Sequence, residues 1–217
     1  MKKLFLFLYS IMGGLLIGIG AIAFLSIENK VVGAIFFSLG LFTIVTNGYN
    51  LFTGKVSYIF EREPAYLIDV VLIWLGNFVG TFICGSLVRA TRVGPALAER
   101  AVVMTETKLG DSLLSIFILA IFCNILIVVA VESYTRNPHE FGKYLGLVMA
   151  IAAFIICGYE HVVANMAYFT IAGAWDNSVG AGNIWVYLLV MTLGNAVGGV
   201  IIPVCRQLRE KSEKAGG

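Results

Sequence analysis

The chain has 217 residues, of which 59% are hydrophobic and only 13% charged, and its mean hydropathy is +0.90. Soluble domains carry about a quarter charged residues, so this composition excludes an ordinary soluble domain and indicates a membrane protein. The formal net charge is only +2, and no basic tract with interleaved aromatic residues is present. We therefore expect the lipid bilayer as a partner and no nucleic acid.

Six hydrophobic segments follow one another along the chain, beginning directly after Met1-Lys2-Lys3. They cover about residues 4–27, 31–60, 66–88, 112–132, 144–171 and 184–204. The first is too long for the apolar core of a signal peptide, and each is near the ~20 residues that an α-helix needs to cross a bilayer. Long apolar runs favour helices over barrel strands. The sequence thus predicts an all-α membrane protein, with residues 1–217 in a single transmembrane domain.

Lysine and arginine are unevenly divided between the two sides that six crossings would have. With the N-terminus inside, the inner segments hold ten of these residues and the outer segments hold five. Positive residues accumulate on the cytoplasmic side of membrane proteins. We therefore expect a multi-pass protein of the cell membrane with both termini in the cytoplasm.

The four cysteines, Cys84, Cys123, Cys157 and Cys205, belong to the hydrophobic part of the sequence and show no C-x-x-C spacing. This pattern indicates neither a zinc site nor a disulfide framework. We interpret the cysteines as small apolar packing residues, and we expect no metal and no cofactor.

A short motif recurs in the third and sixth segments. Gly76-Asn77-Phe78-Val79-Gly80 is matched 118 residues later by Gly194-Asn195-Ala196-Val197-Gly198, and Gly48-Tyr49 in the second segment is matched by Gly158-Tyr159 in the fifth. Halves of three crossings each require the second half to be inverted, and inverted repeats place a site on broken helices near the midplane. The halves would cover about residues 1–90 and 105–205. Glycines four residues apart also predict close helix packing.

The second segment is interrupted where Gly48, Gly54 and two asparagines break a helix. Irregular backbone at membrane depth is tolerated only inside protein or along a water-filled path, so we expect this loop to line a path. Thr53 would offer a hydroxyl there, and Leu51 and Phe52 would offer apolar bulk. The alternative is a loop at a helix end in the membrane interface.

Glu160 and His161 lie side by side in the fifth segment, within an otherwise apolar run. Ionisable residues at membrane depth are costly and usually face the bundle interior or a water-filled path. Neighbouring helical residues point about 100° apart, so His161, which can donate or carry a proton near neutral pH, is predicted to face the path. Glu160 is predicted to point into the protein and cap backbone amides of the break. The alternative is that His161 only packs.

Two further polar residues stand near apolar segments. Asn124 lies midway along the fourth segment, where an asparagine bonds a neighbouring helix or lines a path, and both roles stay open. Lys108 precedes that segment and, on sequence grounds, is predicted to extend its amine toward the lipid headgroups.

Together these stretches resemble the formate/nitrite transporter family, which are channels for small monovalent anions, over nearly the whole chain. The motifs that carry the resemblance are N-L-F-T-G at 50–54, G-N-F-V-G-T at 76–81, C-N at 123–124, G-Y-E-H-V-V-A-N-M at 158–166 and G-N-A-V-G-G at 194–199. The resemblance implies an aquaporin-like bundle of six transmembrane helices in an inverted 3+3 repeat, with broken second and fifth helices. It also implies self-association as a homopentamer, with a pore in each protomer.

The resemblance implies roles for single residues as well. The pore and selectivity residues would be His161, Thr53, Asn124 and Lys108, and the lysine would favour anions. Two apolar constrictions would be formed by Leu41 and Leu51, nearer the cytoplasm, and by Phe37, Phe52 and Phe154. The stretch Gly48-Tyr49-Asn50 looks more like the hydrosulfide-conducting branch of the family, and Glu132 stands where relatives often have an aromatic residue.

We therefore expect a channel for anions of weak acids, namely hydrosulfide, formate or nitrite, in which His161 stabilises the anion by a hydrogen bond or by giving it a proton. A proton-coupled symporter of formate or nitrite is the alternative, and it would use the same residues. A membrane-embedded enzyme acting through Glu160 and His161 is a remote alternative, because H-E-x-x-H and G-x-S-x-G motifs are absent. An aquaporin-type water pore would need paired Asn-Pro-Ala loops, which the sequence lacks.

Overall fold

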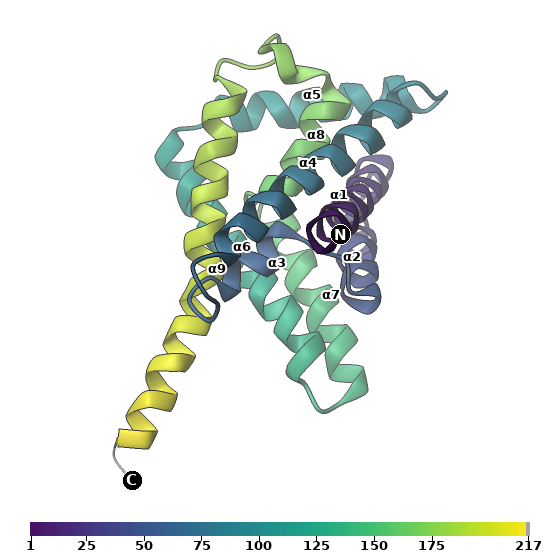
Figure 1. Ribbon diagram of the computed structural model, residues 1–217. Coiled ribbons are helices and arrows are strands. Elements are labelled where there is room, and N and C mark those ends of the chain that lie inside the picture. Colours follow the sequence, from purple (N-terminus) through teal and green to yellow (C-terminus); the bar gives the residue numbers. More distant parts are fainter. Residues whose placement is uncertain (216–217) are drawn as a thin grey trace.

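The computed structural model describes residues 1–215, and every regular element in that range is helical (Figure 1). The first half contains α1 (Lys2–Ser26), α2 (Lys30–Asn47), the short α3 (Phe52–Lys55), the 3-10 turn η1 (Val56–Tyr58) and α4 (Tyr66–Arg89). Asn29 starts α2 by accepting the backbone N–H groups of Val31 and Val32, the usual role of an asparagine N-cap. The all-α prediction is confirmed.

The second half repeats this order of long, broken and long helices. It contains α6 (Leu113–Arg136), α7 (Glu140–Ile156), α8 (Val162–Ala172), the 3-10 turn η2 (Ala174–Asp176) and α9 (Ile184–Ala215). The helix α9 extends about eleven residues beyond the apolar segment predicted to end at residue 204, so the polar tail is helical as far as the structure describes it. Its last turns project beyond the bundle (Figure 1).

The connection between the halves, treated as a polar stretch in the sequence, contains a sixteen-residue helix, α5 (Gly94–Leu109). This helix runs across one end of the bundle (Figure 1). Its buried residues include Leu97, Ala101, Thr105 and Leu109, which are four apart and so lie along one face. The amphipathic face packs α5 against α8 and so turns its buried side toward the interior of the molecule.

Glycines allow α1 to pack tightly on α4, and α6 on α9. A Cβ atom on Gly80 would lie 2.1 Å from the carbonyl oxygen of Ile11, and one on Gly198 would lie 2.1 Å from that of Ile121. Only glycine permits such a close backbone approach, as the small-xxx-small spacing predicted. These two helix pairs therefore form matching walls on either side of the broken helices.

Two helices break where the sequence predicted. Gly48 ends α2 with φ +72°, and Gly158 follows α7 with φ +70°, a left-handed conformation that glycine adopts without strain. The next N–H in each case bonds back five residues, from Tyr49 to Ile44 at 3.0 Å and from Tyr159 to Phe154 at 2.9 Å. The chain then restarts as α3 and α8.

Among residues 1–215, five helices are long and apolar enough to cross a membrane by length and composition. They are α1, α2, α4, α6 and the part of α9 over Ile184–Lys214. The helix α8 is apolar but has only eleven residues, and ten of its residues are buried, so it lies in the interior rather than against lipid.

Candidate functional site

Buried polar side chains gather where the two short helices begin. Each of the following is at most 3% exposed: Thr53, Asn77, Asn124, Glu160, His161, Asn165 and Asn195. They come from α3, α4, α6, the break before α8, α8 itself and α9. Polar groups this deeply buried are costly unless they are paired, so their hydrogen bonds define what the site can do.

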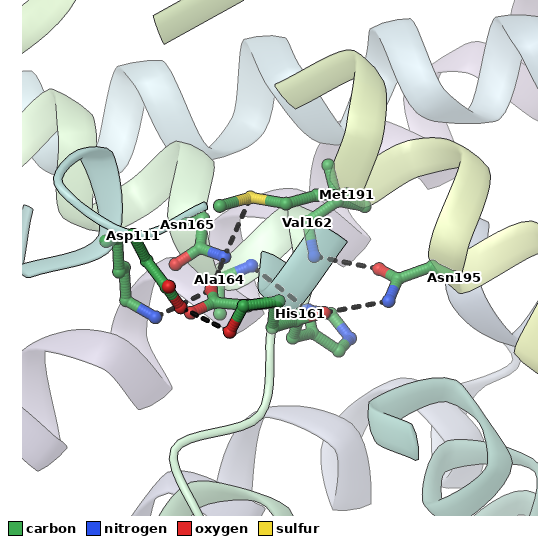
Figure 2. Close-up of polar contacts among 10 residues, drawn as sticks. Asp111, His161, Val162, Ala164, Asn165, Met191 and Asn195 are labelled. Atoms are coloured by element: carbon green, nitrogen blue, oxygen red, sulfur yellow. Dashed lines mark hydrogen bonds and ion pairs between the residues drawn. The ribbon is translucent and has the colours of Figure 1, made fainter. Parts of the chain in front are cut away.

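His161 is the N-cap of α8 and joins the two short helices. Its Nδ1 atom accepts the backbone N–H of Ala164 at 3.0 Å (Figure 2). Its Nε2 atom lies 3.0 Å from the hydroxyl oxygen of Thr53 on α3. The ring also stacks on Phe154, with centroids 5.7 Å apart. The predicted pore residues His161 and Thr53 are thus brought together.

The contact with Ala164 decides which ring nitrogen of His161 carries the proton. Because Nδ1 accepts an amide hydrogen, it is unprotonated, and the neutral ring carries its proton on Nε2. The Nε2–H group then donates to the oxygen of Thr53, and the Thr53 hydroxyl hydrogen is left to donate elsewhere. This pair can present hydrogen-bond donors to a small acceptor.

Glu160 and Lys108 form a buried ion pair beside the histidine. The Lys108 ammonium donates to Oε2 of Glu160 at 2.7 Å, and their side chains are only 12% and 4% exposed. The same carboxylate oxygen accepts from the amide of Asn165 at 2.7 Å. The prediction that Lys108 extends to the headgroups is wrong, because the amphipathic face of α5 draws its last turn inward. The predicted capping of backbone amides by the Glu160 carboxylate is also wrong.

Asparagines from the long helices carry out that capping. Asn195 accepts the N–H of Val162 at 2.9 Å (Figure 2). It also donates to the carbonyl oxygens of Ala120 and Glu160 at 2.7 and 2.8 Å. Sequence reasoning used the G-N-x-V-G motif to identify the repeat and assigned its glycines to helix packing, but it gave the asparagine no role. The recurrence of an asparagine between its glycines was the signal that pointed to a paired structural role.

Asn77 makes the same set of contacts in the first half. It accepts the N–H of Phe52 at 2.8 Å and donates to the carbonyl oxygens of Ser10 and Asn50 at 2.7 and 2.9 Å. Asn77 therefore binds the first N–H of α3 in the same way that Asn195 binds the first N–H of α8. Each asparagine also holds a carbonyl oxygen of the loop that precedes the short helix.

Asn124 lies in the same buried region but bonds a different partner. Its Nδ2 group donates to the carbonyl oxygen of Asn195 at 2.6 Å, whereas its Oδ1 atom has no hydrogen-bond partner among the described residues. No hydrogen bond in residues 1–215 joins Asn124 to His161 or Thr53. Its position thus ties α6 to α9 and leaves one buried acceptor open.

The predicted constriction residues are all buried, but they do not lie in one place. Phe37 packs edge-to-face on Phe154, with centroids 5.9 Å apart, and Phe154 continues the stack to His161. Leu41 and Leu51 line a cavity of about 150 Å³ together with Gly54 and Lys55 of α3. Phe52 instead lines an apolar groove between α4 and α9.

Two glycines assigned to the helix break differ in their surroundings. Gly48 has a positive φ and terminates α2, as the break requires. Gly54 lies within α3, and a Cβ atom there would meet only Val131, at an ordinary contact distance of 3.7 Å. The break therefore depends on Gly48 rather than on Gly54.

The same fold is found in solved structures of ion channels. The chain superimposes on a structure named "Pentameric formate channel with formate bound" with a TM-score of 0.82 and 25% identity, over 96% of this chain and 98% of that one. It also superimposes on an "FNT family ion channel" with a TM-score of 0.77 and 24% identity, over 92% and 87% of the two chains, a likeness that concerns the fold.

Comparison of the sequence with known proteins also finds channels and transporters. The chain is 31% identical to formate channel BtFdhC of Bacillus thuringiensis, over 80% of this chain and 70% of the relative. It is 28% identical to nitrite transporter NirC of Salmonella typhimurium, over 88% and 78%. These relatives are channels and transporters, not enzymes, which sets aside the membrane-embedded enzyme. The family described as "Formate/nitrite transporter" matches residues 1–207. The chain is therefore a multi-pass membrane protein that belongs to the formate/nitrite transporter family.

Proposed function

We propose that this chain is a channel for small monovalent anions of weak acids, namely formate, nitrite and hydrosulfide, and that permeation is assisted by His161. The names of the relatives, which are formate channels and a nitrite transporter, support the substrate class. The observation that carries the proposal is the 3.0 Å contact between Nε2 of His161 and the hydroxyl of Thr53, both buried.

The mechanism follows from the cost of moving a charge through apolar surroundings. An anion that passes Leu41, Leu51 and the phenylalanine pair loses its water, which is expensive without replacement hydrogen bonds. The hydroxyl hydrogen of Thr53 and, where the anion displaces the Thr53 oxygen, the Nε2–H group of His161 replace water as donors. The ammonium of Lys108 is neutralised by Glu160, so it contributes a fixed dipole beside the site and not a free charge.

The geometry favours hydrogen bonding over proton delivery by His161. To give a proton and remain a neutral ring, the histidine would first need protons on both nitrogens. A proton on Nδ1 would remove the acceptor for the backbone N–H of Ala164. The Nδ1 hydrogen and the Ala164 amide hydrogen would then point at each other and repel. The anion therefore accepts a hydrogen bond from a neutral ring.

We further propose six crossings in an inverted 3+3 repeat, a homopentamer, and both termini in the cytoplasm. The matching contacts of Asn77 and Asn195 support the repeat. The pentameric state of the similar formate channel supports the assembly. The excess of lysine and arginine on the side of the termini supports the orientation.

The test is flux into proteoliposomes for formate, nitrite, hydrosulfide and chloride, at two pH values, for the wild type and His161→Asn. We expect weak-acid anions to exceed chloride in the wild type and to lose that advantage in the variant. Equal chloride flux that the substitution does not change would contradict the proposal. Flux that moves one proton with each anion would favour the symporter, whereas anion current without coupled proton movement would favour the channel.

A further inference from the structure

A small cavity lies immediately outside the leucine pair. It has a volume of about 150 Å³ and is formed where α2 ends, α3 turns into η1, and α6 ends. Leu41 and Leu51, each 2% exposed, form its inner wall, and Lys55, Tyr58 and Thr135 supply its polar groups. An anion that leaves the Thr53–His161 pair through the leucines on this side would enter this cavity.

Lys55 is positioned for this cavity by the same short helix that positions Thr53. Residues two apart on a helix point roughly 200° apart, so α3 directs Thr53 to His161 and Lys55 to the opposite side. The backbone of this turn is also fixed, because the hydroxyl of Tyr66 donates to the carbonyl oxygen of Lys55 at 3.0 Å.

The ammonium of Lys55 has no counter-ion in the part of the chain that the structure describes. Among residues 1–215 no carboxylate lies within ion-pair distance of it, and it makes no hydrogen bond there. The charged neighbour that acts on it is Arg62, which has the same sign. The carboxylate that α6 carries, Glu132, is paired with Arg206 and Arg136. Among the described residues, the positive charge of Lys55 at this cavity is therefore uncompensated.

We propose that Lys55 and this cavity form a capture site for a small monovalent anion, one step outside the leucine pair. A partly buried cation attracts an anion more strongly than an exposed one, and a charged cleft raises the local concentration of its counter-ion. The unpaired lysine is thus a specificity residue for anions on this side of the pore. The inference rests on the proposed function, because it assigns the site to the permeating anion.

The first test is formate flux as a function of concentration, with formate on the side of the termini. Lys55→Gln should raise the half-saturating concentration about threefold or more at low ionic strength, whereas Lys55→Arg should stay near the wild type. Lys211→Gln, on the exposed part of α9, is the matched control. The difference should shrink in about 1 M of an impermeant salt, where charges are screened within about 3 Å. A half-saturating concentration that is unchanged in Lys55→Gln would overturn the inference while leaving the channel proposal intact.

A second test does not depend on transport. In protein with the exposed Cys157 and Cys205 replaced by serine, Thr135→Cys places a thiol on the cavity rim. We expect the anionic reagent 2-sulfonatoethyl methanethiosulfonate to react several-fold faster, relative to its trimethylammonium analogue, when Lys55 is present than in Lys55→Gln. An equal ratio in the two proteins would refute the capture site. If the wild type carries none of the anions but this ratio responds to Lys55, the channel proposal fails and the anion site remains.

Discussion

Asn77 and Asn195 hold equivalent positions in the two halves of the molecule. Each uses its Oδ1 atom to accept the first N–H of a short helix, and each uses its amide to hold two carbonyl oxygens, one in the preceding loop and one on a long helix. The side chains are fully buried, at 0% exposure. The two breaks in the membrane helices are therefore stabilised by the same device, built on the same motif.

Asn77→Ala and Asn195→Ala should each destabilise the protein. Either change leaves a buried helix-start N–H without a partner, which costs about 1–3 kcal/mol, in addition to the lost amide bonds. Unfolding of the purified protein in increasing denaturing detergent would measure the loss. Asn47→Ala is the matched control, because Asn47 is exposed and donates only to Thr43 and Thr46 of its own helix. A loss in the control equal to that in the buried variants would contradict the argument.

His161 combines two tasks that substitution can separate. In His161→Asn the new side chain would retain an N-cap acceptor for Ala164, because asparagine is among the preferred capping residues, but it is too short to replace the Nε2 contact with Thr53. His161→Asn should therefore keep most of the stability while losing anion selectivity. His161→Phe should lose both, with a capping cost of about 0.5–2 kcal/mol. Parallel unfolding and flux measurements check this separation, and it fails if His161→Asn retains wild-type selectivity.

Gly48 and Gly54 should respond oppositely to alanine. Gly48 has φ +72°, where a Cβ atom costs about 1–2 kcal/mol, so Gly48→Ala should lower stability. Gly54 is helical, and an added Cβ there would have only the Val131 side chain within 4 Å. Alanine favours helix over glycine by up to about 1 kcal/mol, so Gly54→Ala should be neutral or stabilising. Detergent unfolding of both variants is the measurement, and destabilisation by Gly54→Ala would show that this glycine has a tighter role.

Much of the fold was predictable because its signals are local. Apolar runs predicted the long helices, and Gly48 and Gly158 predicted the breaks, since a residue with positive φ ends a helix within a few positions. The helix α5 was missed because its composition is polar. The four-residue spacing from Leu97 to Leu109, after Pro95 in the first turn, was the available signal.

The candidate site was predictable only in part because its contacts join distant residues. Lys108 and Glu160 are 52 residues apart, and Thr53 and His161 are 108 apart. No spacing rule relates such positions, so the sequence identified ionisable residues at membrane depth without their partners. That is why Lys108 was predicted at the headgroups, and why the capping role of Asn195 was given to Glu160.

The pair of Lys108 and Glu160 predicts a strongly non-additive response to substitution. Lys108→Met removes the cation and leaves a buried carboxylate with only the Asn165 amide, which should cost about 3–5 kcal/mol. Glu160→Gln alone should likewise destabilise the protein, because it leaves the buried ammonium of Lys108 without its carboxylate partner. The double variant removes both charges, while the glutamine still accepts from Asn165, so it should be more stable than Lys108→Met. Unfolding of all four proteins completes the cycle, and additive losses would mean that the 2.7 Å contact contributes no coupling.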